Sequence, residues 1–248
     1  MAVSPKTRLL AVPTVALMSL ALLAGCGSSD KKESVAAETS SSASASAEQS
    51  QAAEETSSAA ADEAKVEAVI PDGFKKVTAP NNKISFAVPE GWMEMDSEAI
   101  ANTDAIQEYL DQAAQGTNFT PEELKSQMAQ LDLMATSVTP NEDGFAENVN
   151  VNAEPVLVTS LPDQAEMESL AKGINATPGE YKKISTPLGE GTQLSYTLDV
   201  TGVSVHGVFV VVPSGTGTGF SVLTVSSSNA DSAAKLAEQM AGSLSKAS

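Results

Sequence analysis

TQLSYTLDV-TG-VSVHGVFVVV, residues 192–212, predicts two strands joined by a tight turn at Thr201-Gly202. Polar and apolar residues alternate along 192–200, which is the pattern of a strand with two different faces. A connection this short joins neighbouring strands only in the antiparallel sense. The second strand ends in the apolar run 208–212, so both of its faces need cover from water. The pair therefore predicts an antiparallel sheet with helices on both faces.

Further strands and helices are predicted on either side of this hairpin. Alternation predicts strands at 83–88, 131–138, 147–154, 181–186 and 220–226, with a turn at Gly189-Glu190-Gly191. Helical spacing of apolar residues, with capping residues at the starts, predicts helices at 97–115, 121–131, 162–173 and 230–244. Together these elements predict one α+β domain, a twisted antiparallel sheet between helices, over residues 68–248.

Residues 1–25 have the pattern of a secretory signal peptide. Lys6 and Arg8 form its positive start, and the apolar stretch 9–23 is shorter than the roughly 20 residues of a spanning helix. The stretch ends in LAGC, which resembles the bacterial lipobox, where the cysteine sulfur takes a diacylglyceryl group. Cys26 is therefore the expected lipidation site, the alternative being an ordinary signal peptide with an incidental cysteine. Two acyl chains, of the palmitate kind, suffice for stable anchoring, so we expect a cell-membrane location on the extracytoplasmic face.

Residues 26–67 predict a disordered tether. Ser, Ala and Glu dominate them, and such a composition buries too little apolar surface to offset the entropy of ordering. A flexible linker of about 40 residues reaches roughly 35 Å, which would lift the domain off the bilayer. A transient helix near 59–68 is the alternative, because Ala and Glu are good helix formers.

Charge and composition exclude several classes of function. The 248-residue chain has a net charge of −18, whereas binding nucleic acid needs Lys and Arg to neutralise phosphates. One cysteine and one histidine exclude an internal disulfide framework and sites built from several Cys or His ligands. We therefore expect no nucleic-acid partner, no metal and no cofactor.

Several sequence features resemble one bacterial family. The series I-x-F-x-V-P-x-G-W at 84–92 precedes a helix, and Asn-Val-Asn-Val at 148–151 precedes a helix, a strand meander and a closing helix. This order resembles the actinobacterial LpqN/LpqT-type lipoproteins, which share a PsbP-like α-β-α sandwich, over about residues 70–246. The resemblance implies a cell-envelope lipoprotein without catalysis, and some members are implicated in handling trehalose-linked glycolipids.

Two features are candidates for ligand binding, each with a plainer alternative. Asn148, Asn150 and Asn152 form a polar row on one face of a strand, which is either a solvent-facing side or a set of amides for a sugar head group. Trp92 follows a turn and is either a core residue or a stacking platform for a sugar.

Three other features carry weaker hypotheses. His206, the only histidine, could act with Asp199 and a serine, although no G-x-S-x-G elbow supplies the nucleophile. The run Gly215-x-Gly217-x-Gly219 lies between two strands and lacks the following Lys, so it predicts a hairpin turn rather than a phosphate loop. The loop 141–144 is acidic but lacks the ligand pattern of an EF-hand.

The sequence thus predicts a non-catalytic binding or accessory protein of the cell envelope, held by lipid at Cys26. Its ligand would be a lipid or glycolipid in a crevice between sheet and helices, or its partner another envelope protein. The alternatives are a hydrolase that depends on Ser and His, and a structural spacer or adaptor in the wall.

Overall fold

The computed structural model describes residues 67–102, 106–107, 109–111, 114, 120–200 and 203–247. The predicted signal peptide, Cys26 and nearly all of the predicted tether lie outside these residues. Ten named strands and four named helices follow one another through the described part of the chain. The strands are β1 Phe74–Ala79, β2 Ile84–Pro89, β3 Trp92–Asp96, β4 Leu131–Ser137, β5 Asn148–Asn152, β6 Thr177–Thr186, β7 Gly189–Val200, β8 Val203–Pro213, β9 Phe220–Ser227 and β10 Ser245–Lys246. The helices are α1 Ser97–Ala101, α3 Pro121–Met128, α4 Gln164–Gly173 and α5 Ala230–Gly242.

The strands form a large and a small antiparallel sheet, and the predicted α+β class is confirmed. The large sheet has the order β3-β4-β5-β9-β8-β7-β6, and the small one has the order β1-β2-β10. The predicted central hairpin is present, since β7 and β8 pair from Thr192↔Val211 to Val200↔Val203. The turn predicted in the glycine run is also present, because Ser214 N–H donates to the carbonyl of Gly219 between β8 and β9.

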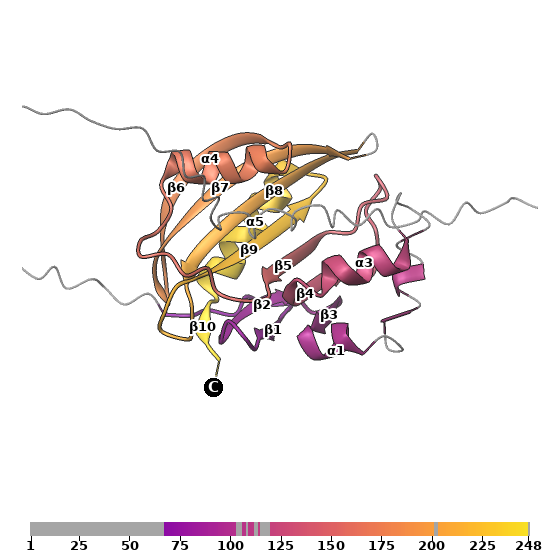
Figure 1. Cartoon of the computed structure of the whole chain (residues 1–248), viewed down its shortest axis with the longest axis horizontal. Coiled ribbons are helices and arrows are strands. Elements are labelled where there is room, and N and C mark those ends of the chain that lie inside the picture. The colour runs from indigo at the N-terminus through magenta and orange to yellow at the C-terminus, as the bar shows by residue number, and fades with distance from the viewer. Residues whose placement is uncertain are drawn as a thin grey trace, which may run out of the picture.

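Helices cover both faces of the large sheet, as the apolar end of the hairpin predicts. α5 packs on β8 and β9, together with β2 of the small sheet, while α4 packs on β6 and β7 (Figure 1). α3 starts at a capping box formed by Thr120 and Glu123, and the side chain of Asn229 caps α5. These caps accept N–H groups that the first helical turn leaves unpaired, and so they fix where each helix begins.

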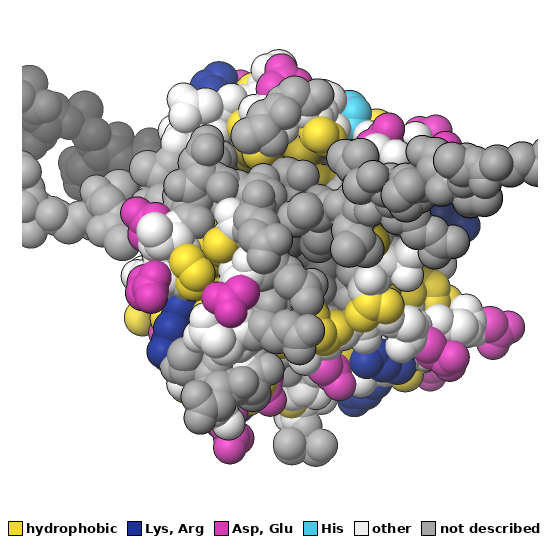
Figure 2. All heavy atoms as spheres, turned by 90° about the vertical axis from the view of Figure 1, so that its right-hand side faces the viewer, with side chains coloured by type: hydrophobic (Ala, Val, Ile, Leu, Met, Phe, Trp, Pro, Cys, Tyr) yellow, Lys and Arg dark blue, Asp and Glu magenta, His cyan; other side chains and the backbone are white. Residues whose placement is uncertain are grey.

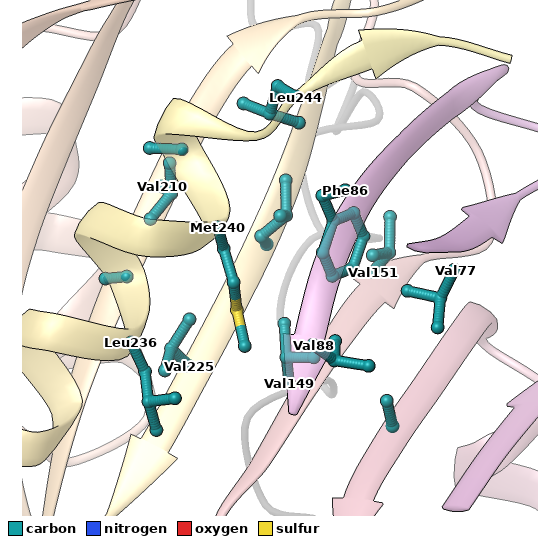
Figure 3. Packing of buried hydrophobic residues seen from close by; sticks show 14 of the residues in the cluster. Val77, Phe86, Val88, Val149, Val151, Val210, Val225, Leu236, Met240 and Leu244 are labelled. Atoms are coloured by element: carbon teal, nitrogen blue, oxygen red, sulfur yellow. The ribbon is translucent and has the colours of Figure 1, made fainter. Parts of the chain in front are cut away.

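Three hydrophobic clusters hold these layers together. The largest joins α5 and the small sheet to one face of the large sheet. Figure 3 shows Leu236, Met240 and Leu244 directed from the α5 side toward Phe86 of β2 and toward valines of the large sheet. The second cluster lies under α4, and the third lies between α1, α3 and the strands β3 and β4. Among the described residues, all buried members of these clusters lie within 77–244, so residues 68–248 contain every part of this core.

Three parts of the architecture differ from the sequence predictions. The helix predicted over 97–115 is not continuous, because α1 ends at Ala101 and Asn102 is extended. The small sheet was not expected, because only Val77 and Ala79 of β1 are buried and β10 is a strand only through its pairing with β2. The turn predicted at Gly189-Glu190-Gly191 is wrong: β7 begins at Gly189, and Thr186 pairs with Gly189 across the shorter connection. Gly191 serves close packing instead, since a Cβ there would lie 2.7 Å from the carbonyl oxygen of Val211, whereas Gly189 adopts a φ of 122° that favours glycine.

Candidate functional site

A groove lies on the face of the large sheet that carries α4. Two cavities form it, of about 330 and 800 Å³, and they share Val156, Leu157, Leu170 and Val222 as lining residues. The sheet forms the floor, α4 forms one wall, and residues 153–162, here called the strap, form the other. Volumes of this size lie within the usual range for small-molecule sites, roughly 300–1,000 Å³.

The strap is placed by a short pairing with the start of β9. Val156 N–H donates to the carbonyl of Phe220 at 2.8 Å, and Phe220 N–H donates back to Val156 at 3.0 Å. Gly219, at a φ of 71°, allows this approach, since a Cβ there would lie 2.6 Å from the carbonyl oxygen of Val156. At its other end the strap meets α4, where the hydroxyl of Tyr181 donates to the carbonyl of Pro162 at 3.1 Å.

The larger cavity is mainly apolar. Met167 and Leu170 face it from α4, and Val211 and Val222 face it from the sheet. The strap adds Leu157 and Val158, whose side chains are 79% and 47% exposed. Large apolar side chains that stay in contact with water at the edge of an apolar cavity favour an apolar occupant.

The smaller cavity has a polar floor with a fixed direction of hydrogen bonding. Asn148 Nδ2 donates to the carbonyl of Ala146 at 3.0 Å, and Asn150 Nδ2 donates to Asn148 Oδ1 at 3.3 Å. Since a backbone carbonyl can only accept, this chain of bonds assigns the oxygen and nitrogen of both amides. Asn150 Oδ1 is left buried without a partner. Six other buried side-chain atoms of the described residues also lack a partner, but Asn150 is the one of them whose residue lines this cavity. A donor that reached its Oδ1 would offset the cost of burying that oxygen.

An aromatic pair continues this floor toward α4. Met134, Asn150, Thr224 and Phe209 are register partners across β4, β5, β9 and β8, so their side chains share one face. Phe209 lines the smaller cavity and stacks on Tyr196, with 4.5 Å between the ring centroids. The floor therefore presents polar amides and hydroxyls next to a buried aromatic surface.

The structure brings together only part of the residues proposed from sequence. Asn150 and Asn152 line the smaller cavity, and Asn148 lies beside Asn150 and orients it. The solvent-facing alternative is wrong for Asn148 and Asn150, because both are buried. Trp92 packs in the cluster on the opposite face of the sheet, under α5 and the small sheet, and does not line the groove.

The strap and α4 were missed from sequence as parts of a site. A signal was present, since PVLVTSLP at 155–162 is an uncharged run bounded by two prolines in a strongly acidic chain. Such a run would be expected to be buried or to contact a partner. What the sequence could not supply is the pairing with Phe220 that lays the strap across the floor.

The pKa of Tyr181 is raised by partial burial, with a smaller effect from the carboxylates of Asp163 and Glu166. Its hydroxyl therefore stays protonated through the neutral range and keeps donating to Pro162. This bond ties the end of the strap to β6.

The geometry around His206 does not support the hypothesis of a histidine-dependent hydrolase. His206 Nδ1 lies 3.3 Å from Thr197 Oγ1, its neighbour across the hairpin. Asp199 is opposite Ser204 instead, and among the described residues no hydrogen bond or ion pair joins Asp199 to His206.

In the acidic loop, Asn141 Oδ1 accepts the N–H groups of Asp143 and Phe145, which closes a turn. The described part of the chain holds no group of three or more potential metal-ligating side chains.

Comparison with known proteins gives a structural likeness alone. No family model and no curated protein matches the chain. The structure is similar to the solution structure of the cyanobacterial PsbP protein CyanoP from Synechocystis sp. PCC 6803. The TM-score is 0.42 and the sequence identity 11%, over 70% of this chain and 92% of that one. A likeness of this extent assigns neither ligand nor partner. Within the described residues, no helix has the length and apolarity to cross a membrane.

Proposed function

We propose that this protein is a membrane-anchored, extracytoplasmic lipoprotein whose domain binds a lipid or glycolipid without catalysis. The observation that carries the proposal is the groove: an apolar cavity of about 800 Å³ that meets a smaller one with a polar floor. An amphiphile has the same division, with an apolar chain and a polar head. Each methylene buried in such a cavity gains about 0.8 kcal/mol, so an alkyl chain gives the larger part of the affinity.

The anchoring part of the proposal rests on the sequence. The lipobox pattern at 23–26 assigns the lipid to Cys26, and the Ser- and Ala-rich tether separates the membrane from the domain. The motifs at 84–92 and 148–151 support membership of the LpqN/LpqT-type lipoproteins with their PsbP-like domain. A carrier or sensor of envelope lipids would need both parts, since the tether keeps the groove near the membrane that supplies the ligand.

Native mass spectrometry tests the binding function. Residues 68–248, cut from the tether of the anchored protein on the envelope of the native host and purified without detergent, should carry an additional lipid or glycolipid mass. A bare polypeptide mass would contradict the proposal and favour a protein adaptor, for which crosslinking in the living cell would be the next experiment.

A matched pair of variants ties the bound mass to the groove. Leu170→Lys places a charge where the two cavities meet and should abolish the additional mass. Ala165→Lys adds the same charge to an exposed position of α4 that lines neither cavity, and should keep it. Loss of the ligand in both variants, or in neither, would show that the mass is bound elsewhere.

A further inference from the structure

The ionisable groups that border the groove all have one sign. Glu154 borders the smaller cavity and Glu166 the larger one. Among the described residues that line either cavity there is no Lys, Arg or His. The whole chain has a net charge of −18, and the side of the molecule shown in Figure 2 carries both Asp and Glu side chains and some Lys and Arg side chains.

The helix end that could attract an anion is already occupied. α4 begins beside the larger cavity, and the N–H groups of a first helical turn ordinarily favour negative charge. Here Asp163 Oδ1 accepts the N–H of Glu166, and Glu166 Oε2 accepts the N–H of Asp163. The capping box thus places two carboxylates where a phosphate or carboxylate head would otherwise bind.

The polar floor contains a hydrogen-bond acceptor that has no donor. Asn150 is only 3% exposed, and its Oδ1 has no partner, while its Nδ2 is held by Asn148. An ionised carboxylate or phosphate can only accept, so it would leave this oxygen unpaired. A hydroxyl, amide or ammonium head would donate to it and recover the cost of its burial.

From these two independent features we propose that the groove selects amphiphiles by head group: it takes heads that donate hydrogen bonds and bear no negative charge, and it rejects anionic ones. The inference rests on the proposed function, because it presumes that an alkyl chain fills the larger cavity. It implies that the protein is not filled by anionic lipids of the membrane that anchors it. The ligand has to be drawn from the neutral or cationic amphiphiles.

Displacement of a neutral fluorescent dye, N-phenyl-1-naphthylamine, from residues 68–248 measures the selection. The competitors share a dodecyl chain and differ in the head: dodecylglycerol, dodecylamine and laurate, each below its micelle concentration. We expect dodecylglycerol and dodecylamine to bind at least about tenfold more tightly than laurate at low salt. Because the two carboxylates are exposed, the electrostatic part of this difference should shrink near 1 M salt, where the screening length is about 3 Å.

Variants separate the two features. Glu154→Gln with Glu166→Gln should raise laurate affinity several-fold at low salt, and glutamine at position 166 can still accept in the capping box. Glu238→Gln, on the exposed side of α5 at the opposite face, removes the same charge and should change little. Asn150→Leu removes the free acceptor and should weaken dodecylglycerol while leaving laurate unchanged.

The outcomes distinguish this inference from the proposed function. Equal affinity for the three heads, or tighter binding of laurate, would overturn the selection but leave an amphiphile-binding groove. An equal effect of Glu238→Gln would assign the discrimination to net charge and overturn the role of the groove carboxylates. Failure of every competitor to displace the dye would overturn the proposed function and the inference with it.

Discussion

Gly207→Ala tests how tightly the aromatic part of the groove floor is packed. Gly207 on β8 lies directly opposite Tyr196 on β7. A Cβ at position 207 would lie 2.0 Å from Tyr196 Cζ and 2.3 Å from its Oη, whereas ordinary contacts begin near 3.4 Å. The ring is buried and stacked on Phe209, so it cannot move aside without disturbing that neighbour as well.

The expected cost follows from these distances. Forcing an additional methyl group into a packed core typically costs about 1–3 kcal/mol. Complete loss of a buried aromatic side chain, about 3–5 kcal/mol, is the upper bound if the ring of Tyr196 leaves the core. We therefore expect Gly207→Ala to lower the free energy of unfolding by about 2–4 kcal/mol. Because Phe209 lines the smaller cavity, affinity for dodecylglycerol should fall as well.

Urea unfolding of residues 68–248 measures this cost. Trp92, the only tryptophan, is buried on the opposite face of the sheet, so its emission reports unfolding of the whole domain. Gly242→Ala is the control, since beyond its chain neighbours and the backbone of its own helix no atom lies within 4 Å of its added Cβ. In a Tyr196→Leu background the nearest atoms are absent, and Gly207→Ala should then cost less than about 0.5 kcal/mol. An unchanged cost in that background would refute the clash as the cause.

Three further predictions concern other parts of the chain. The Tyr109 hydroxyl is buried without a partner and burial raises its pKa, so Tyr109→Phe should stabilise the domain by roughly 1 kcal/mol at neutral pH. The unfolded tyrosine ionises near pH 10 and the folded one at a higher pH, so wild-type stability should fall above pH 10 by up to about 1.4 kcal/mol per pH unit. Urea titrations at several pH values should show a smaller loss for Tyr109→Phe. Cys26→Ser should release or misprocess the protein, and a variant that still fractionates as a mature lipid-anchored protein would exclude the lipobox. His206→Ala should leave dye displacement and ligand release unchanged, because its contact is with Thr197, whereas loss of ester turnover in this variant would establish a hydrolase.

The antiparallel hairpin and its covered faces could be predicted because both follow from local pattern. A short turn fixes the sense of pairing, and an apolar run fixes the need for cover on both sides. The small sheet could not be predicted in this way. In β1 the residues Phe74, Lys75 and Lys76 show no clean alternation, and β10 has too few residues to carry a pattern. Both form strands because each pairs with β2, and this pairing depends on the tertiary fold rather than on the local sequence.

The candidate site was predictable in its residue types but not in its location. Period-two alternation correctly places Asn148 and Asn150 opposite Val149 and Val151. Alternation alone cannot say whether the polar face meets water or a second layer, and here it is buried. Trp92 shows the converse, because a turn-flanking aromatic is equally compatible with a core position and a binding surface.

The strand β5 links the groove to the main core. Val149 and Val151 are fully buried under α5 and the small sheet, while Asn150 on the same strand forms the groove floor. Because this strand is part of a close-packed core, the floor is rigid and adapts little to a ligand. The strap is different, since paired hydrogen bonds between Val156 and Phe220 hold it and Leu157 stands largely in water. Adjustment to chain length must therefore come from the strap side, whereas the choice of head group belongs to the fixed amide of Asn150. Substitutions in the strap should accordingly change affinity before stability, and substitutions at Val149 or Val151 should change stability first.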